Sequence, residues 1–314
     1  MAELLSSRKS LLLLFLLPLC SGLLATGLFA SADPYEEQYA NVNDSLRFPD
    51  FKSRAEGTYV FENFRDGGAE KGKYEPRWTR CSVDVTAVDR VYFMVCYFNI
   101  AGFYKAGHAQ MVFEMAPGSC LADGRDVRGM VASFEAYRGK GVDYSALAGL
   151  FDKYRSIWII NSISDALEKA ELVNSSVEFH ELGLSLEERS ALLETFLISA
   201  FQRDFLEVAP YNTIKNSCIT NQFRVLGNVV DWPEGKTFPS TSVPRKAGKV
   251  MKSTGLVVDS FTLECPEELR KWREDGTLPP GQEDGSGGGS GSDSIDGGGE
   301  SEGDSLSYED IHSL

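Results

Sequence analysis

A thiol enzyme needs a cysteine and a base within hydrogen-bond reach of its sulfur. Cys218 lies in the stretch Tyr211–Leu226, which begins as a polar turn and continues as an amphipathic run. The apolar positions of that run recur at helical spacing, at Ile219, Phe223 and Leu226. We expect Asn216 to cap this helix, so that Cys218 lies in the first turn, where backbone N–H groups and the helix dipole favour a thiolate. The alternative is a buried apolar cysteine or half of a disulfide.

The chain has three histidines that could act as the base. His312 lies in an acidic C-terminal tail, and His180 could occupy the exposed face of a strand. His108 follows a glycine at the start of an apolar strand, a position that would expose its ring at the sheet edge. We therefore pair His108 with Cys218.

A base of this kind also needs a polar group that orients its ring. A carboxylate holds the imidazole tautomer best, and Glu135 is our first choice, with Ser133 and Glu114 as alternatives. The backbone N–H of Cys218 would contribute to an oxyanion hole, with support from Tyr211 and the Asn216 turn. No metal-ligand cluster or phosphate loop is visible in the sequence, so we expect no cofactor and no metal.

The elements that must position these residues follow from the apolar pattern. Continuous or alternating apolar runs predict strands at Val91–Ile100, Gly107–Glu114, Gly129–Tyr137 and Val177–Leu184, the first two as an antiparallel pair. Helical character marks Ser145–Tyr154 and Asn161–Leu172, and the capping box Ser185–Glu188 opens a strong helix. We expect an α+β fold, a small antiparallel sheet packed against the Cys218 helix and the helix 185–205.

The order of these motifs resembles that of circularly permuted papain-like proteins, NlpC/P60-like proteins among them, in which the histidine strand precedes the cysteine helix. It resembles more closely the DUF4105 family, also called the Lnb N-terminal periplasmic domain. The resemblance covers residues 76–258 and rests on short motifs in the same order, which are Trp78, Gly107-His108-Ala109, Gly149–Tyr154, Val177–Leu184, Ser185–Glu188, Tyr211, Asn216-Ser217-Cys218 and Pro244–Val257. It implies a permuted papain-like fold and acyl transfer by a Cys–His pair.

Residues 1–32 have the organisation of a secretory signal peptide. Arg8 and Lys9 precede an apolar run, and Ala30-Ser31-Ala32 supplies the small residues of a cleavage site. We expect export to the periplasm or the extracellular space, with a single N-terminal membrane anchor as the alternative. After the signal peptide we expect an N-terminal arm at 33–75, one domain at 76–275 and a disordered acidic Gly/Ser-rich tail at 276–314.

Five cysteines remain after cleavage of that signal peptide. An oxidising compartment permits disulfides, and an odd number leaves at least one thiol unpaired. Two bridges among Cys81, Cys96, Cys120 and Cys265 would leave Cys218 free, and the sequence does not assign the pairing.

The formal net charge of −15 comes largely from the tail, where nine Asp and Glu follow Gly276 without a single Lys or Arg. The sequence shows no cluster of basic residues of the kind that binds nucleic acid. The segment Lys236–Lys252 carries five Lys or Arg and no acidic residue, so a contact with anionic headgroups is an alternative to a solvated loop.

The first hypothesis is therefore a secreted acyltransferase or amide/ester hydrolase that acts on an acyl-lipid, a peptide or a lipoprotein. The alternative is a non-catalytic secreted binding or scaffold protein that keeps the fold. A structural protein that binds cations through its acidic tail ranks last.

Overall fold

The computed structural model describes residues 46–67, 76–100, 104–139, 142, 144–172, 175–202, 210–231, 246–263 and 266–275. The strands within them are β1 (Asp50–Ala55), β2 (Thr58–Arg65), β3 (Trp78–Asp84), β4 (Val88–Ile100), β5 (Tyr104–Met115), β6 (Cys120–Ala122), β7 (Arg125–Asp126), β8 (Gly129–Tyr137), β9 (Arg155–Ser162), β10 (Ser176–Leu182) and β11 (Val257–Leu263). The helices are α3 (Ala146–Leu150), α4 (Ile163–Leu172), α5 (Leu186–Phe201), α7 (Cys218–Val229), α8 (Ala247–Ser253) and α9 (Pro266–Asp275).

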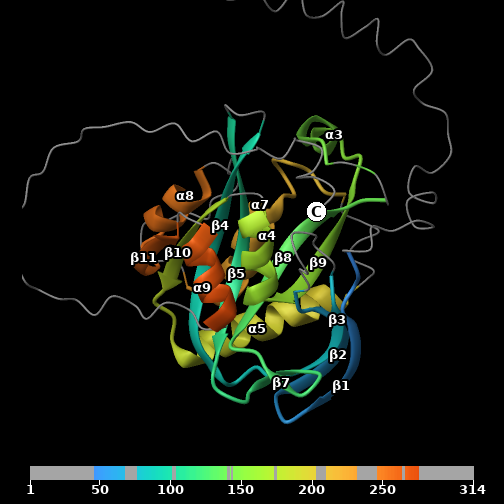
Figure 1. Cartoon of the computed structure of the whole chain (residues 1–314), viewed down its shortest axis with the longest axis vertical. Coiled ribbons are helices and arrows are strands. Elements are labelled where there is room, and N and C mark those ends of the chain that lie inside the picture. Colours follow the sequence, from blue (N-terminus) through green and yellow to red (C-terminus); the bar gives the residue numbers. More distant parts are fainter. Residues whose placement is uncertain are drawn as a thin grey trace, which may run out of the picture.

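These strands form one eleven-stranded mixed sheet in the order β11-β10-β4-β5-β8-β9-β2-β3-β6-β7, with β1 paired to β2 outside this path (Figure 1). The strand pairs are antiparallel except β2 and β9, which run parallel where Arg65 meets Asn161. The α+β prediction of a permuted papain-like fold with a small antiparallel sheet is therefore wrong. The sheet is large and mixed, and it is the main body of the described structure.

The error arose because several strands of this sheet are not evident from the sequence. The extended arm expected at 33–75 contains β1 and β2, and nearly every residue of β1 is exposed, so the strand shows no alternation of buried and exposed residues. Strand β9, which pairs with β2 and β8, is buried at seven of its eight positions, which also removes the alternation. Neither strand carries the period-two pattern on which a prediction from sequence depends.

The sheet is covered on both faces, and β4 shows how. Val91, Phe93 and Val95 belong to the larger core cluster under α5, α7 and α8, while Tyr92 and Met94 belong to the cluster under α4 and α9. In Figure 1, α4 and α9 lie side by side over one face of the sheet. The strand predicted from this continuous apolar run is present as β4, and it is buried on both faces of the sheet.

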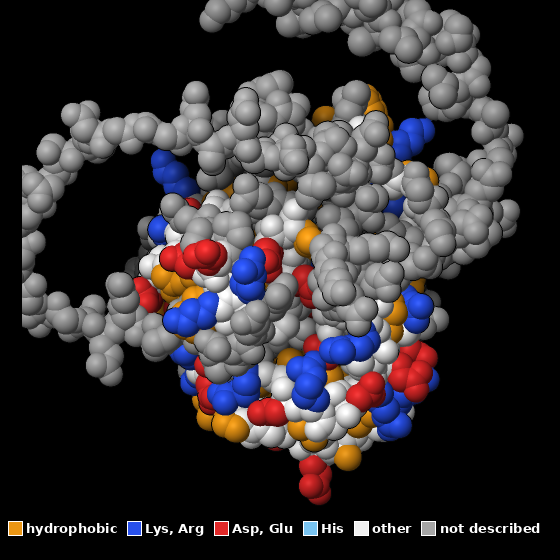
Figure 2. All heavy atoms as spheres, viewed as in Figure 1, with side chains coloured by type: hydrophobic (Ala, Val, Ile, Leu, Met, Phe, Trp, Pro, Cys, Tyr) orange, Lys and Arg blue, Asp and Glu red, His pale blue; other side chains and the backbone are white. Residues whose placement is uncertain are grey.

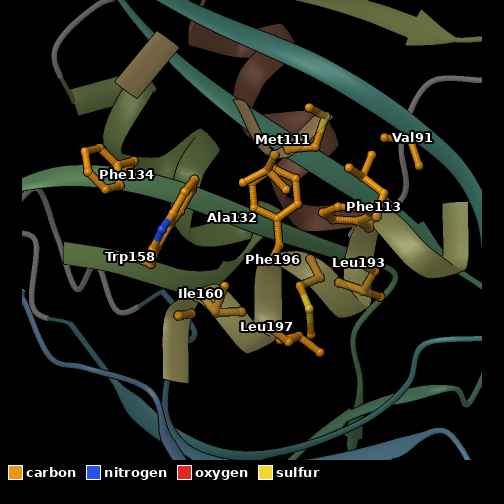
Figure 3. Close-up of a cluster of buried hydrophobic side chains, with 14 of the residues drawn as sticks. Val91, Met111, Phe113, Ala132, Phe134, Trp158, Ile160, Leu193, Phe196 and Leu197 are labelled. Carbon is orange, nitrogen blue, oxygen red and sulfur yellow. The ribbon is translucent and has the colours of Figure 1, made fainter. Parts of the chain in front are cut away.

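The centre of the larger cluster lies beneath α5 (Figure 3). Phe196 meets the ring of Phe113 edge-to-face at 5.7 Å and that of Trp158 at 5.2 Å between centroids. The side chains of α5 that face this core are buried, at Leu192, Leu193, Phe196, Leu197 and Ala200, and Phe201 packs against the same cluster half-buried. Its predicted capping box is also present, between Ser185 and Glu188.

On the face seen in Figure 2, the Lys and Arg side chains of the described part are interspersed with Asp and Glu. Among the helices that the structure describes, none is both long and apolar enough to span a bilayer.

Candidate active site

Helix α7 begins at Cys218, as the amphipathic pattern predicts, but its cap differs from the prediction. Ser217, not Asn216, is the N-cap residue, and its hydroxyl accepts a hydrogen bond from the backbone N–H of Thr220. The Thr220 hydroxyl in turn accepts from the Ser217 backbone N–H at 2.7 Å. Two N–H groups at the start of the helix are thereby satisfied, and Cys218 is fixed as its first residue.

Asn216 instead holds the loop that leads to the helix. Its amide donates to the Pro210 carbonyl at 2.8 Å, and its Oδ1 accepts from the Asn221 amide at 2.9 Å. Asn212, at the other end of a small antiparallel bridge with Asn216, accepts the backbone N–H groups of Ile214 and Lys215. This loop, 211–217, therefore has a defined conformation up to the cysteine.

His108 lies on β5, an interior strand between β4 and β8, and not at the sheet edge expected from the sequence. The register of β5 with β8 runs from Glu114 opposite Gly129 to Gln110 opposite Ser133. His108 and Glu135 each stand two residues beyond that last pair. Continued by two residues, this register places the two side chains opposite each other on adjacent strands.

The imidazole of His108 contacts both candidate orienting groups of β8. Its Nε2 lies 2.8 Å from Ser133 Oγ and 3.1 Å from Glu135 Oε1. The Ser133 hydroxyl donates to Glu135 at 2.7 Å, and the Gln110 amide donates to Ser133 Oγ at 3.0 Å. Because the serine proton is directed to Glu135, Ser133 Oγ can only accept from His108. Nε2 therefore carries a proton, and Nδ1 is the nitrogen left for Cys218.

The charges around His108 favour its protonated form. Burial alone lowers the pKa of His108, but the Glu135 carboxylate and then Cys218, with which His108 forms a side-chain hydrogen bond, raise that pKa well above its ordinary value. Burial would likewise raise the pKa of Glu135, but His108, Lys169 and the Ser133 hydrogen bond hold it far below the usual range. Glu135 is therefore a carboxylate.

Two tyrosines lie beside Cys218. Burial, and next the neighbouring Cys218, raise the pKa of Tyr211 well above its usual value, and a side-chain hydrogen bond links Tyr211 to Tyr144. Burial also raises the pKa of Tyr144, whose hydroxyl lies 3.0 Å from Thr213 Oγ1. Both phenols therefore keep their protons at neutral pH and can donate to an oxygen that forms next to the sulfur.

The structure thus brings Cys218, His108, Glu135 and Tyr211 into one site, with Asn216 in the loop that supports it. It separates Glu114 from that site, because this carboxylate pairs with Arg90 Nε at 2.5 Å. His180 is fully buried, with Nδ1 2.9 Å from Ser260 Oγ, and so is not on an exposed face.

A family model for the Lnb N-terminal periplasmic domain matches residues 74–240, more than half of the chain. The chain belongs to this family. All of the site residues above fall within the matched range of the Lnb N-terminal periplasmic domain. Among curated proteins and among solved structures, no match was found.

Membership of a periplasmic domain family supports the expected export of the chain. The signal peptide, its possible anchor and the acidic tail lie outside the described residues, so their predictions stay predictions. The same is true of most of Lys236–Lys252, of which Lys246, Lys249 and Lys252 are described and exposed.

Three side chains that contribute to this site, those of Ser217, Tyr144 and Gln110, were not among the residues predicted from the sequence. Ser217 could have been identified, because it directly precedes the amphipathic run with a threonine three residues later. Tyr144 and Gln110 carry no such signal, because each reaches the site only through a loop or a strand pairing. Among the described residues, no group of three or more His, Cys, Asp or Glu could hold a metal ion.

Proposed function

We propose that this domain is a thiol enzyme, an acyltransferase or amide/ester hydrolase, with Cys218 as nucleophile and His108 as its base. The observation that carries the proposal is the continuous chain of contacts from Cys218 through His108 to Ser133 and Glu135. A structural cysteine needs no such partners, whereas a nucleophilic thiol needs a base that a third group holds in one orientation.

Transfer of the Cys218 thiol proton to Nδ1 of His108 gives a thiolate beside an imidazolium, the state that the raised pKa of His108 favours, and the reaction begins from this ion pair. The sulfur then attacks the carbonyl carbon of an ester or amide, and the carbonyl oxygen becomes an oxyanion. The N–H of Cys218, the first of α7 and thus without a partner inside the helix, stabilises that oxyanion together with the Tyr211 hydroxyl.

Collapse of this intermediate breaks the bond to the leaving alcohol or amine, which takes the proton from His108. Cys218 then carries the acyl group as a thioester. His108 next removes a proton from the second substrate. Water as that substrate gives hydrolysis, and an amine or alcohol gives acyl transfer. Glu135 keeps its negative charge throughout and stabilises the imidazolium in each step.

Exposed apolar side chains beside the site support an acyl-bearing substrate, such as an acyl-lipid or a lipoprotein, more than a polar peptide. Leu150 and Phe151, at the end of α3, are 40% and 68% exposed, and Ile214 is 47% exposed. The Asn212 side-chain amide donates a hydrogen bond to the Leu150 carbonyl, and the Thr213 backbone N–H donates to the Gly149 carbonyl. The loop that carries Ile214 is thereby held against the end of α3, so Ile214 belongs to the same surface. The exposed Lys246, Lys249 and Lys252 suit a contact with anionic headgroups.

The test uses p-nitrophenyl esters of short and long acyl chains. We expect a burst of p-nitrophenol and an acyl adduct on Cys218 in the intact-mass spectrum, both absent from Cys218→Ala. His108→Gln should lower the rate of acylation by about two orders of magnitude or more.

A matched control is Cys120→Ala, which removes a buried thiol on β6, outside the site, and should leave acylation by the folded protein unchanged. If the folded wild type forms no adduct with any chain length, the enzyme proposal is wrong. The protein would then be the alternative, a binding or scaffold protein.

A further inference from the structure

Two buried cysteines outside the candidate active site lie in contact with each other. Cys81 is on β3 and Cys120 begins β6, and their Sγ atoms are 3.8 Å apart. Neither side chain has any exposed surface. In the register, Cys81 faces Ala122 and Val83 faces Cys120, so the two cysteines are diagonal neighbours on adjacent antiparallel strands.

The other described cysteines are placed differently. Cys96 packs against the core cluster under α4 and α9, whereas Cys81 and Cys120 belong to the cluster on the other face of the sheet. Cys218 is hydrogen-bonded to His108. Within the described part of the chain, Cys81 and Cys120 are therefore the two thiols that the fold brings together.

We propose that Cys81 and Cys120 form a structural disulfide in the exported protein. The two Sγ atoms are already in van der Waals contact at 3.8 Å, and a disulfide would bring them to about 2.05 Å. Export to an oxidising compartment, which the periplasmic family supports, provides the conditions under which such bonds persist.

The oxidant is a disulfide, either that of a thiol–disulfide oxidoreductase or glutathione disulfide. The Cys81 thiolate attacks one sulfur of the oxidant and displaces the other as a thiolate. The Cys120 thiolate then attacks the Cys81 sulfur of the mixed disulfide and displaces the second thiolate. The protein loses two protons and two electrons, and the oxidant becomes two thiols.

The bond has to form before the core closes. Burial, and then the neighbouring Cys120, raise the pKa of Cys81 far above its ordinary value, so the folded thiol does not supply a thiolate. Once formed, the bridge links β3 to β6, a strand of three residues held by three pairs with β3. It also uses up two of the thiols that could otherwise form a wrong bridge with Cys218.

Differential alkylation of the exported full-length chain tests this assignment. The protein is quenched in acid, unfolded, alkylated with N-ethylmaleimide, reduced and alkylated again with iodoacetamide. Trypsin separates Cys81, Cys96 and Cys120 into three peptides, because Arg80, Arg90, Lys105 and Arg125 lie between or beside them.

We expect Cys81 and Cys120 to carry the second reagent, Cys96 and Cys218 to carry the first, and the unreduced digest to contain the peptides of Cys81 and Cys120 joined. In Cys81→Ala the first reagent should reach Cys120, and in Cys96→Ala the bridge should remain. If the first reagent labels Cys81 and Cys120 in the wild type, or if either joins another cysteine, the proposal is wrong. Because alkylation follows unfolding, the result does not depend on how stable the variants are.

Discussion

At the scale of single residues, the protonation of His108 is the feature on which the site depends. Glu135 and Ser133 hold Nε2, so the other edge of the ring is available to Cys218. A protonated imidazole next to a cysteine stabilises the thiolate, which is the reactive form of the side chain. The same network fixes the orientation of the ring through groups that themselves have partners, such as Gln110 and Lys169.

We expect the ring protons of His108 to titrate well above pH 6.5 in an NMR titration and those of His180 to titrate below it. Glu135 raises the pKa of His108, whereas burial lowers that of His180. Glu135→Gln removes the charge and should bring the pKa of His108 down by at least one unit. A His108 signal that titrates below pH 6.5 in the wild type would contradict this view of the site.

The raised pKa also predicts the sign of a stability change. A histidine whose pKa is higher in the folded state stabilises the fold fully below its unfolded pKa of about 6.5, and this contribution is lost as the pH rises through the folded pKa. The thermal midpoint of the wild type minus that of His108→Gln should therefore decrease between pH 6 and pH 9. A difference that grows over this range would mean that the pKa of His108 is lowered.

At the scale of elements, α7 is positioned by its cap and by contacts with the sheet, one of them a hydrogen bond. The Gln222 amide, one turn after Cys218, donates to the carbonyl of Ala132 on β8 at 2.8 Å. Ser217 ends the preceding loop and starts the helix. Together these contacts hold the first turn against the strand that carries Ser133 and Glu135.

Ser217→Ala should reduce the free energy of unfolding by about 1 kcal/mol and slow the alkylation of Cys218. Ser185→Ala removes the cap of α5 and is the matched control, because it should cost about as much stability and leave the alkylation rate unchanged. Urea unfolding measures the free energy of unfolding, and the rate of reaction with iodoacetamide measures the alkylation of Cys218. Equal slowing in both variants would show that the cap of α7 affects the thiol only through general stability.

At the scale of the whole molecule, the sheet joins segments that are far apart in the sequence. Arg65 of β2 forms a buried ion pair with Asp165 of α4 at 2.9 Å, with side chains 1% and 0% exposed. This pair lies where β2 meets β9, the single parallel junction in the described sheet. Asn161 of β9 also donates to Asp165 at 2.9 Å, so three elements converge on one carboxylate.

Arg65→Met should lower the free energy of unfolding by about 3–5 kcal/mol, because it leaves a buried carboxylate without its cation. Adding Asp165→Leu should restore much of that loss. Lys52→Met, in the exposed pair with Glu62, is the control and should cost less than about 1 kcal/mol. If Arg65→Met costs no more than this surface variant, the pair does not hold the junction.

The sequence predicts the local parts of this molecule and not its long-range pairings. The spacing of Ile219, Phe223 and Leu226 locates the start of α7, because helical periodicity is a property of neighbouring residues. The contact of His108 with Glu135 depends on the pairing of β5 with β8, for which the sequence offers only a choice of three acceptors. The size of the sheet was missed because β1 is exposed at nearly every residue and β9 joins β2, about a hundred residues earlier in the chain.

The most direct test of the central claim is the rate of Cys218 alkylation between pH 4 and pH 9, with peptide mapping, in the wild type and in His108→Gln. An activated pair predicts that Cys218 reacts selectively, that its rate stays high well below pH 8, and that the variant loses this reactivity at low pH. If Cys218 in the folded wild type is inert, or reacts as an ordinary thiol would in both proteins, the proposed thiol chemistry is wrong.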